Sequence, residues 1–413
     1  MASYILWIQN RKTIMLADYR VNIYNPENGE LVDVLEAWRR LEFRHIVNAP
    51  GWCRFTTNAF SNTDAYINTA PIEVWRRLSD YKPIAVSSDY RRTGNWYVEW
   101  SGLIGDTVES VYENGDRDLT VYCDGGLDLI NRRNVLWYAS TSSSESKKVA
   151  IPAQTAIYQF VEENCGASAT EGAGRITTGT IASLDIPVLI GAGDNWSGIR
   201  AWRNVLDVIQ EIGNARDIDF DVVSLGDGRW QFLTHTEQIG ENRTTNGLDS
   251  ATGLNSYGNA PVIFSLEQHN VARVTYKTAN RGSATFVAAL GKGQYGARTV
   301  GTYTNSDKFN VDRRVNQREI TRNATTQDSV TELETVAEEW GARMSPSDDF
   351  KFVPLLGSKN TVYGHTYWWG DTITARYNPR SIELDKRLVG VTIVVDKNGE
   401  QFRSWDFLTI PRT

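Results

Sequence analysis

The first and last parts of the chain alternate apolar and polar residues with a period of two. Three stretches share one pattern, in which an Asn-Gly pair at 28–29, 114–115 or 398–399 separates two alternating segments: residues 19–35, 106–124 and 388–410. A period of two predicts strands, and Asn-Gly tolerates the positive φ angles of a type I′ turn. We therefore predict antiparallel hairpins at both ends of the chain, as in a barrel or sandwich.

The middle of the chain changes to a helical pattern after a serine-rich link, Ser140 to Lys148. Pro152 and Gly166 bound a predicted helix with one apolar face: Ala153, Ile157, Phe160 and Val161. A second stripe at helical spacing predicts a helix from about Gly198 to Ile212: Trp202, Val205, Leu206, Ile209 and Ile212. Residues 217–235 then form a hairpin around residues 226–228, which completes a small α+β unit.

Strands return from Val262 to Thr304, and a third helix is predicted from about Ser329 to Trp340. Ser329 and Glu332 have the spacing of a capping box. The helix has a predicted buried stripe: Val330, Leu333, Val336, Ala337 and Trp340. A closing β region begins near Phe350. The predicted fold class is therefore mainly β with an α+β insertion.

The composition is that of a globular protein with many tryptophans. The chain has 413 residues, of which 41% are hydrophobic and 14 are Trp, and its length suggests two or three domains. Tryptophan serves both in cores and as an anchor in protein–protein interfaces. The net charge of −7 argues against a protein that grips DNA, because such binding requires Lys and Arg. A conduit that DNA slides past remains compatible with it.

No targeting segment, membrane span or disulfide framework is predicted. Polar residues 9–12 interrupt the first apolar run, and no stretch reaches the ~18 apolar residues of a membrane span. Cys53, Cys123 and Cys165 lie far apart and form no Cys-x-x-Cys pair, so no zinc ribbon is predicted either.

Two stretches invite a catalytic interpretation. "LEFRHIVNAPGWCRFTTN" (residues 41–58) holds His45 and Cys53, but no third residue is nearby to orient them, so we predict a strand, a Pro-Gly turn and a second strand. "GKGQYG" (residues 291–296) matches a dinucleotide fingerprint, but the residues after it alternate like a strand. We predict a tight bend between strands at this point.

Metal and carboxylate chemistry give no clear candidate. The four histidines are scattered and have no metal-ligand spacing. A pair of carboxylates of the glycosidase kind remains open, since the sequence alone gives no distances. We expect no catalytic residue, no cofactor and no metal site.

Several short stretches nevertheless share one layout. Their distinctive residues are a turn at Asn48, Pro50 and Gly51, a strand and following segment with Gly102, Asp124 and Arg132, a Gly-rich turn with Gly293, Gly296 and Arg298, and a late strand with Gly370 and Asp371. Together they resemble the hub proteins at the tip of bacteriophage tails, called baseplate hub or tail-associated minor tail proteins. The resemblance covers nearly the whole chain.

The resemblance implies two tube-like β-barrel domains with an α+β insertion, assembled as a ring of three copies. We expect domains at residues 1–138, 139–248 and 249–413. The implied partners are the distal tail or tail tube protein, the tape-measure protein and tip or fibre proteins, with DNA passing through without specific binding. The implied location is the virion, at the tail tip, after assembly in the host cytoplasm.

The expected function is therefore that of a structural virion protein, a non-enzymatic hub that joins the tail tube to the tip, takes part in host attachment and forms the conduit for genome ejection. The alternative is a β-rich glycan hydrolase or a carbohydrate-binding module for host attachment. A hydrolase needs two carboxylates facing each other across a groove with exposed tryptophan, and this feature distinguishes the hypotheses.

Overall fold

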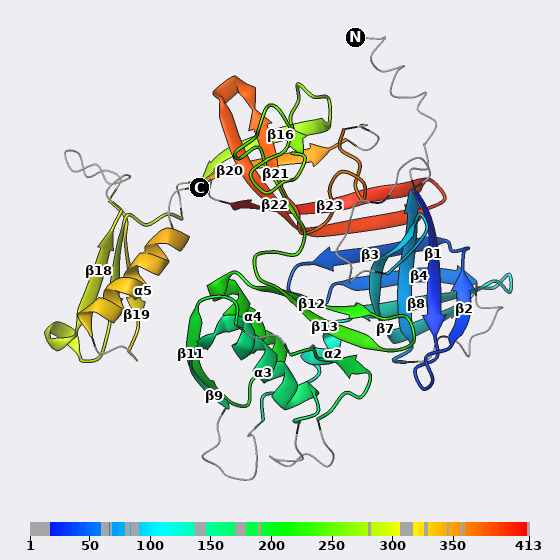
Figure 1. Ribbon diagram of the computed structural model, residues 1–413, viewed down its shortest axis with the longest axis horizontal. Helices are drawn as coiled ribbons and strands as arrows, with labels where there is room; N and C mark the ends of the chain where they lie inside the picture. The colour runs from blue at the N-terminus through cyan, green and yellow to red at the C-terminus, as the bar shows by residue number, and fades with distance from the viewer. Residues whose placement is uncertain are drawn as a thin grey trace. The chain divides into compact units, whose positions relative to one another are not determined.

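The computed structural model of the chain contains two compact units (Figure 1). The larger unit comprises Met1–Asn270 and Pro354–Thr413, and the smaller unit comprises Val271–Val353. The structure describes residues 17–58, 66, 68–78, 83, 91–136, 146–169, 179–188, 191–279, 282–305, 317–325, 329–344, 347–355, 358 and 360–410. Most of the predicted serine-rich link, and the expected domain boundary near residue 138, lie outside these residues.

The larger unit is built on one sheet of thirteen strands. Its strands in chain order are β1 (Ala17–Tyr24), β2 (Leu31–Leu35), β3 (Arg40–Ile46), β4 (Trp52–Asn58), β5 (Pro71–Leu78), β6 (Arg92–Thr93), β7 (Trp96–Val111), β8 (Arg117–Gly125), β14 (Asn242–Arg243), β15 (Ile263–Phe264), β21 (Thr372–Tyr377), β22 (Ile382–Asp396) and β23 (Gly399–Ile410). A short 3-10 helix, η3 (Asn378–Arg380), joins β21 to β22. The spatial order is β14-β21-β22-β3-β4-β8-β7-β5-β1-β2, with β15 beside β21, β23 beside β22 and β6 beside β7.

The three predicted hairpins are confirmed, but their turns differ from the prediction. β1 pairs with β2, β7 with β8 and β22 with β23, all antiparallel. Only the glycine of each turn has a positive φ angle: Gly29, Gly115 and Gly399. A type I′ turn needs a positive φ at both residues. In two of the turns the asparagine instead accepts a backbone hydrogen bond from the residue two positions on, as Asn28 does from Glu30 and Asn114 from Asp116.

The sheet curls without closing into a barrel of described strands. β23 pairs with β22, β2 pairs with β1, and neither ladder continues to a further described strand. The Glu400 carboxylate at the start of β23 instead accepts hydrogen bonds from Tyr19 on β1 and Arg76 on β5. We call these three residues the seam. Side chains, rather than a backbone ladder, join the curled sheet at this place.

The C-terminal strands extend the N-terminal sheet. One edge of β22 pairs first with β21, over residues 382–387, and then with β3, over residues 390–396. The two separate tube-like barrels implied by the resemblance are therefore not seen among the described strands. What is confirmed is the mainly β class.

The predicted α+β insertion is confirmed within the larger unit. It contains α2 (Asp128–Asn131), β9 (Ser146–Pro152), α3 (Ala153–Cys165), β10 (Leu184–Asp185), β11 (Asn195–Arg200), α4 (Val205–Arg216), β12 (Asp219–Ser224) and β13 (Trp230–His235). The apolar faces of α3 and α4 pack with the β12–β13 hairpin in one core that includes Ile157, Phe160, Ile209 and Phe220. Pro152 and Gly166 bound α3 as predicted, although Gly166 has a φ angle of −92° and is not left-handed.

The second predicted helix begins later than the apolar spacing suggested. Residues 195–200 form β11, and α4 begins at Val205 because the Asn204 side chain accepts hydrogen bonds from the backbone amides of its first turn. Trp202, predicted in the buried stripe, is 56% exposed and has a φ angle of 59°. Apolar spacing alone therefore extended this helix too far.

The smaller unit places one helix on a three-stranded sheet. Its elements are β16 (Val271–Ala279), β17 (Phe286–Leu290), η2 (Tyr295–Ala297), β18 (Val300–Thr304), β19 (Glu319–Asn323), α5 (Val330–Arg343) and β20 (Ser347–Pro354), which ends one residue into the larger unit. The sheet has the order β18-β17-β19, while β16 pairs with β20. Leu333 and Ala337 of α5 are buried against the sheet, and Ser329 caps the helix by accepting from the amide of Glu332. Val330, predicted in the buried stripe, is 49% exposed.

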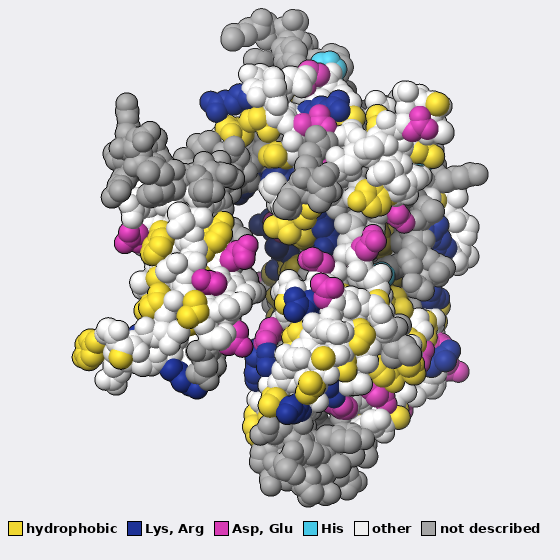
Figure 2. Space-filling view, turned by 60° about the vertical axis from the view of Figure 1, so that its left-hand side comes forward, with side chains coloured by type: hydrophobic (Ala, Val, Ile, Leu, Met, Phe, Trp, Pro, Cys, Tyr) yellow, Lys and Arg dark blue, Asp and Glu magenta, His cyan; other side chains and the backbone are white. Residues whose placement is uncertain are grey.

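The surface charges and helix lengths add two observations. On the face shown in Figure 2, Lys and Arg side chains are interspersed with Asp and Glu side chains. Among the helices that the structure describes, none is both long and apolar enough to span a membrane.

Candidate functional site

The residues singled out near the N-terminal turn gather in one place. Gly51 lies in the β3–β4 turn, and its carbonyl accepts from the amide of Gly125 at 3.5 Å. Gly125 in turn lies opposite Gly102 on β7, and Asp124 lies opposite Trp52 on β4. The close approach of the three strands explains why these positions need small residues.

Asn48 in the same turn connects the sheet to the α+β insertion. Its Nδ2 donates to Asp219 Oδ1 at 3.1 Å, and its Oδ1 accepts from the amide of Phe220 at 2.9 Å. Its backbone carbonyl accepts from Gln210 Nε2 at 2.7 Å, and its φ angle is 59°. Asparagine adopts this left-handed conformation more readily than most residues. Asn48 thus ties the turn to β12 through its side chain and to α4 through its backbone carbonyl.

Asp219 continues this connection to the C-terminal strands. Its Oδ2 accepts from the amide of Ile239 at 2.6 Å and from the guanidinium of Arg387 on β22. Arg387 Nε also donates to the carbonyl of Gly370 at 3.2 Å. Asn48 and Gly370, which lie 322 positions apart in the sequence, are therefore linked through two charged side chains.

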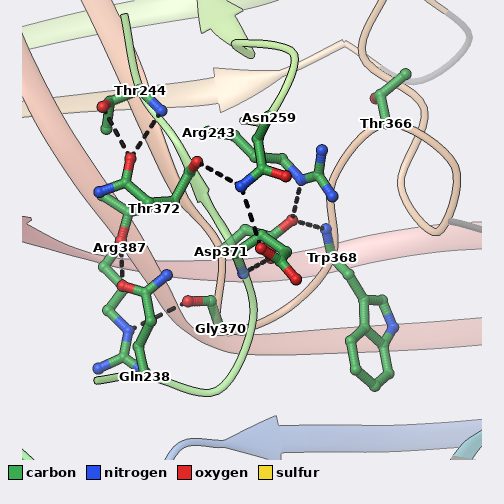
Figure 3. A network of polar contacts seen from close by, with 12 residues as sticks. Gln238, Arg243, Thr244, Asn259, Thr366, Trp368, Gly370, Asp371, Thr372 and Arg387 are labelled. Carbon is green, nitrogen blue, oxygen red and sulfur yellow. Dashed lines mark hydrogen bonds and ion pairs between the residues drawn. The ribbon is translucent and has the colours of Figure 1, made fainter. Parts of the chain in front are cut away.

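Asp371 completes the arrangement (Figure 3). Its carboxylate accepts from the amide of Glu241 at 2.6 Å, the amide of Trp368 at 2.9 Å and Arg243 Nε at 3.1 Å. The residue is only 2% exposed. Burial raises the pKa of Asp371 to about 6, although Arg243 and the two amides act in the opposite direction. We call the connected set Asn48, Asp219, Arg243, Gly370, Asp371 and Arg387 the junction.

The remaining predicted residues lie away from the junction. Arg132 pairs with Asp128 on α2 at 2.6 Å. Arg298 lies in the smaller unit, where it donates to the carbonyl of Gly291 and to Asn323 Oδ1 and so fixes the Gly-rich turn. This turn joins β17 to β18 through η2 with no long helix after it, so the predicted bend between strands is confirmed.

Two of the predicted glycines should differ sharply in their tolerance of a side chain. A Cβ atom on Gly102 would lie 2.2 Å from the Asp124 carbonyl oxygen and 2.3 Å from Trp100, whereas a Cβ atom on Gly296 would meet nothing within 4 Å. We expect Gly102→Ala to lower the free energy of unfolding by about 1–3 kcal/mol. Gly296→Ala, the matched control, should change it by less than about 0.5 kcal/mol. Urea unfolding followed by tryptophan fluorescence measures both, and equal effects would contradict the assigned packing.

Inside the curled sheet lies a polar network that sequence reasoning missed. Arg76 donates to both Glu400 oxygens at 2.8 and 3.0 Å, to the Tyr97 hydroxyl at 2.6 Å and to the carbonyl of Tyr363 at 3.0 Å. The Arg76 and Glu400 side chains are 1% and 3% exposed. The sequence does hint at this network. Arg76 is two and four residues after Val74 and Ile72 on β5, so it faces the same side of the sheet as these buried apolar residues.

His45 and Glu99 extend this interior network. His45 Nε2 lies 3.2 Å from Glu99 Oε1, and the imidazole stacks on Trp369 with ring centroids 4.7 Å apart. The Tyr363 hydroxyl and Trp368 Nε1 also donate to Glu99. Burial acts to raise the pKa of Glu99, but the His45 bond and the Arg76 charge hold it below its usual value.

The predicted strand, turn and strand around His45 and Cys53 are confirmed. Cys53 lies opposite Cys123 on the neighbouring strand, both thiols are buried, and burial raises the pKa of Cys123 well above its usual value. The imidazole of His45 is engaged by Glu99 instead. Within the described part of the chain, no group of three or more His, Cys, Asp or Glu side chains is placed to hold a metal ion.

Comparisons with known proteins agree with this architecture. The family model described as Siphovirus ReqiPepy6 Gp37-like protein matches residues 20–406. The 43 kDa tail protein of prophage MuSo2 from Shewanella oneidensis aligns with 96% of this chain and 98% of its own, at 9% identity and a TM-score of 0.53. A tail protein from Neisseria meningitidis MC58 aligns with 95% and 97%, at 11% identity and a TM-score of 0.53. No curated protein sequence matches significantly. The resemblance to phage tail proteins is thereby confirmed for the family and the fold.

Proposed function

This chain belongs to the family of Siphovirus ReqiPepy6 Gp37-like proteins, and we propose that it is a structural component of the phage tail, the baseplate hub at its distal end. The observation that carries the proposal is the extent of the shared fold. Two tail proteins align with this chain over at least 95% of its length and at least 97% of theirs. Because nearly every part of this chain aligns with these tail proteins, we propose no additional catalytic domain within the aligned residues.

In this proposal three copies form a ring, and the curled sheet of each copy contributes to the wall of a tube. The domains expected at residues 1–138, 139–248 and 249–413 belong to this proposal. Its partners are the distal tail or tail tube protein, the tape-measure protein and the tip or fibre proteins. DNA passes through the ring without specific binding when the genome is ejected during host attachment. The protein resides at the tail tip of the virion.

The buried polar contacts support a role that depends on a fixed shape. Nonlocal ion pairs at the seam and the junction connect strands from both ends of the chain with the α+β insertion. Such pairs add little net stability over apolar packing, but they favour one arrangement of the strands over others. We propose that these pairs keep the sheet and the insertion in register, so that the surfaces that bind neighbouring tail proteins keep one arrangement.

We propose no catalytic activity for the chain. The one Cys/His combination that the sequence offered is not joined in the structure, since His45 is engaged by Glu99 and Cys53 faces Cys123. The carboxylates of the seam and junction are held by arginines or backbone amides. In these positions they hold strands and insertion in one arrangement and offer no free base.

The test is electron microscopy of the purified chain at high concentration, with its solution mass measured on the same sample. We expect three-fold rings with a central pore and a mass about three times the 46.4 kDa of one chain. Antibody labelling of intact particles should place the protein at the distal end of the tail. A monomeric protein that cleaves cell-wall glycan would contradict the proposal. Antibody labelling at a place other than the distal end of the tail would also contradict it.

A further inference from the structure

A groove of about 420 Å³ lies on the outer face of the main sheet. The side chains that define it come from β3, β4, β8 and β23: Glu42, Trp52, Arg54, Tyr122, Asp124 and Arg403. Cys53 and Cys123 lie between these residues at the floor of the groove and are buried, at 1% and 3% exposed. The volume lies within the range of small-ligand sites, roughly 300–1,000 Å³.

Four of these side chains form a compact square on two adjacent strands. Arg54 on β4 lies directly opposite Tyr122 on β8, and Trp52 lies directly opposite Asp124. Directly opposite side chains have Cβ atoms roughly 4.5–5.5 Å apart, so a cation, two aromatic rings and a carboxylate share one small surface. Tyr122 is 41% exposed, and its ring is accessible to a ligand.

Two arginines and two acidic residues line the groove, and a third arginine, Arg40, bonds one of these acidic residues. Glu42 is bonded by Arg40 at 3.0 Å, by Arg54 at 3.0 Å and by Arg403 at 2.9 Å. One carboxylate thus faces three guanidinium groups. Burial acts to raise the pKa of Glu42, but the arginines hold it below its usual value, so it stays ionised and fixes their positions. The side chains of Arg54 and Arg403 remain 38% and 65% exposed.

We propose that this groove binds a saccharide that carries a carboxylate or a phosphate group. Arg54 and Arg403 would bind the anionic group, since guanidinium groups match carboxylate and phosphate oxygens in a bidentate geometry. Tyr122 and Trp52 offer flat apolar faces for the sugar ring. Asp124 accepts hydrogen bonds from sugar hydroxyl groups. The site lies beyond the structural role proposed above, because it gives the chain a ligand of its own.

Two other interpretations of the groove are weaker. A nucleic acid needs a track of cations along several phosphates, whereas this groove is compact, contains Asp124 and belongs to a chain with a net charge of −7. A glycosidase needs two reactive carboxylates, whereas both oxygens of Glu42 are engaged by arginines. The groove is therefore suited to holding an acidic sugar and not to cleaving it.

The experiment is titration calorimetry of the full chain with four defined probes: an oligogalacturonate, a sugar-bearing glycerol phosphate polymer, a neutral maltooligosaccharide and oligothymidylate. We expect one or both acidic saccharides to bind, and the two arms distinguish carboxylate from phosphate as the recognised group. Arg54→Gln with Arg403→Gln should weaken that binding at least tenfold. Arg77→Gln is the matched control, since Arg77 is an exposed arginine of the same sheet that pairs with Asp18 outside the groove, and it should change nothing.

A second variant covers the case in which the double substitution disturbs folding. Tyr122→Ser removes an exposed ring and leaves all three arginines that bond Glu42 in place, and it should weaken acidic saccharide binding at least threefold. The proposal is overturned if neither acidic saccharide binds at millimolar concentration, if the neutral sugar binds equally well, or if oligothymidylate binds more tightly. It is also overturned if both groove variants bind like the wild type. Saccharide binding is measured on the isolated chain. An absence of binding would therefore not affect the ring and tail-tip proposal, which electron microscopy and antibody labelling test separately.

Discussion

Arg76→Met is expected to lower the free energy of unfolding of the larger unit by about 3–5 kcal/mol. The substitution leaves the Glu400 carboxylate buried without its bidentate partner, and the Tyr97 hydroxyl and Tyr363 carbonyl lose a donor. Breaking a buried pair costs more than a surface pair because the remaining charge stays out of water. Urea unfolding followed by tryptophan fluorescence measures the loss.

The next residue in the sequence supplies the control. Arg77 also pairs with an acidic residue, Asp18, but the two side chains are 46% and 39% exposed. Arg77→Met should therefore cost at most about 1 kcal/mol. Replacing Arg76 and Glu400 together by methionine should recover part of the loss, because no uncompensated charge remains buried. A single Arg76→Met variant as stable as Arg77→Met would show that the seam does not hold the sheet together.

Local sequence patterns predicted local structure well. The Asn-Gly hairpins, the Pro-Gly turn and the capped helix at Ser329 each depend on residues close together in the chain, and each is confirmed. Errors arose where two local signals competed. At Gly198 to Ile212 the apolar spacing continued through a strand, and only the Asn204 cap shows where the helix begins.

The pairing of strands from distant segments could not be predicted from the sequence. The placement of β22 against both β21 and β3 joins the two ends of the chain in one sheet, and nothing in either strand specifies its partner. The expectation of two barrels came from the family resemblance, and the strand pattern offered no means of checking it. Strand alternation predicts which face is buried, but it does not predict how many strands share a sheet or whether the sheet closes.

The candidate site was predicted unevenly. The family resemblance named Asn48, Gly370 and Asp371, and the structure connects these three through Asp219 and Arg387. It named none of the charged residues of the seam. Those act across sequence separations of more than 300 residues, and a charged residue in a strand is normally expected on the solvent face. The only indication in the sequence was that these residues alternate in step with the apolar residues of their strands, which places them on the buried face.

Asp371 provides the second large expected effect, which depends on pH. Its pKa of about 6 in the folded chain lies above its usual value of 3.8, because burial disfavours the ionised form. The folded state therefore holds this proton more tightly than the unfolded state. The stabilisation is fully present below pH ~4 and is lost as the pH rises through 6, and a difference of about two pKa units corresponds to roughly 3 kcal/mol.

We expect the wild type to lose roughly 3 kcal/mol of unfolding free energy relative to Asp371→Asn between pH 4 and pH 7, since the amide introduced by this substitution cannot ionise. Urea unfolding across this pH range, with the two proteins compared at each pH, gives the difference directly. Asp227→Asn is the control, because Asp227 is exposed and the Arg229 bond lowers its pKa below the usual value of 3.8. Its contribution therefore changes below pH ~4, and the difference between wild type and Asp227→Asn should stay nearly flat from pH 4 to pH 7. If the wild type instead gains stability relative to Asp371→Asn as the pH rises, Arg243 and the two amides outweigh burial, and the junction is an ion pair throughout this range.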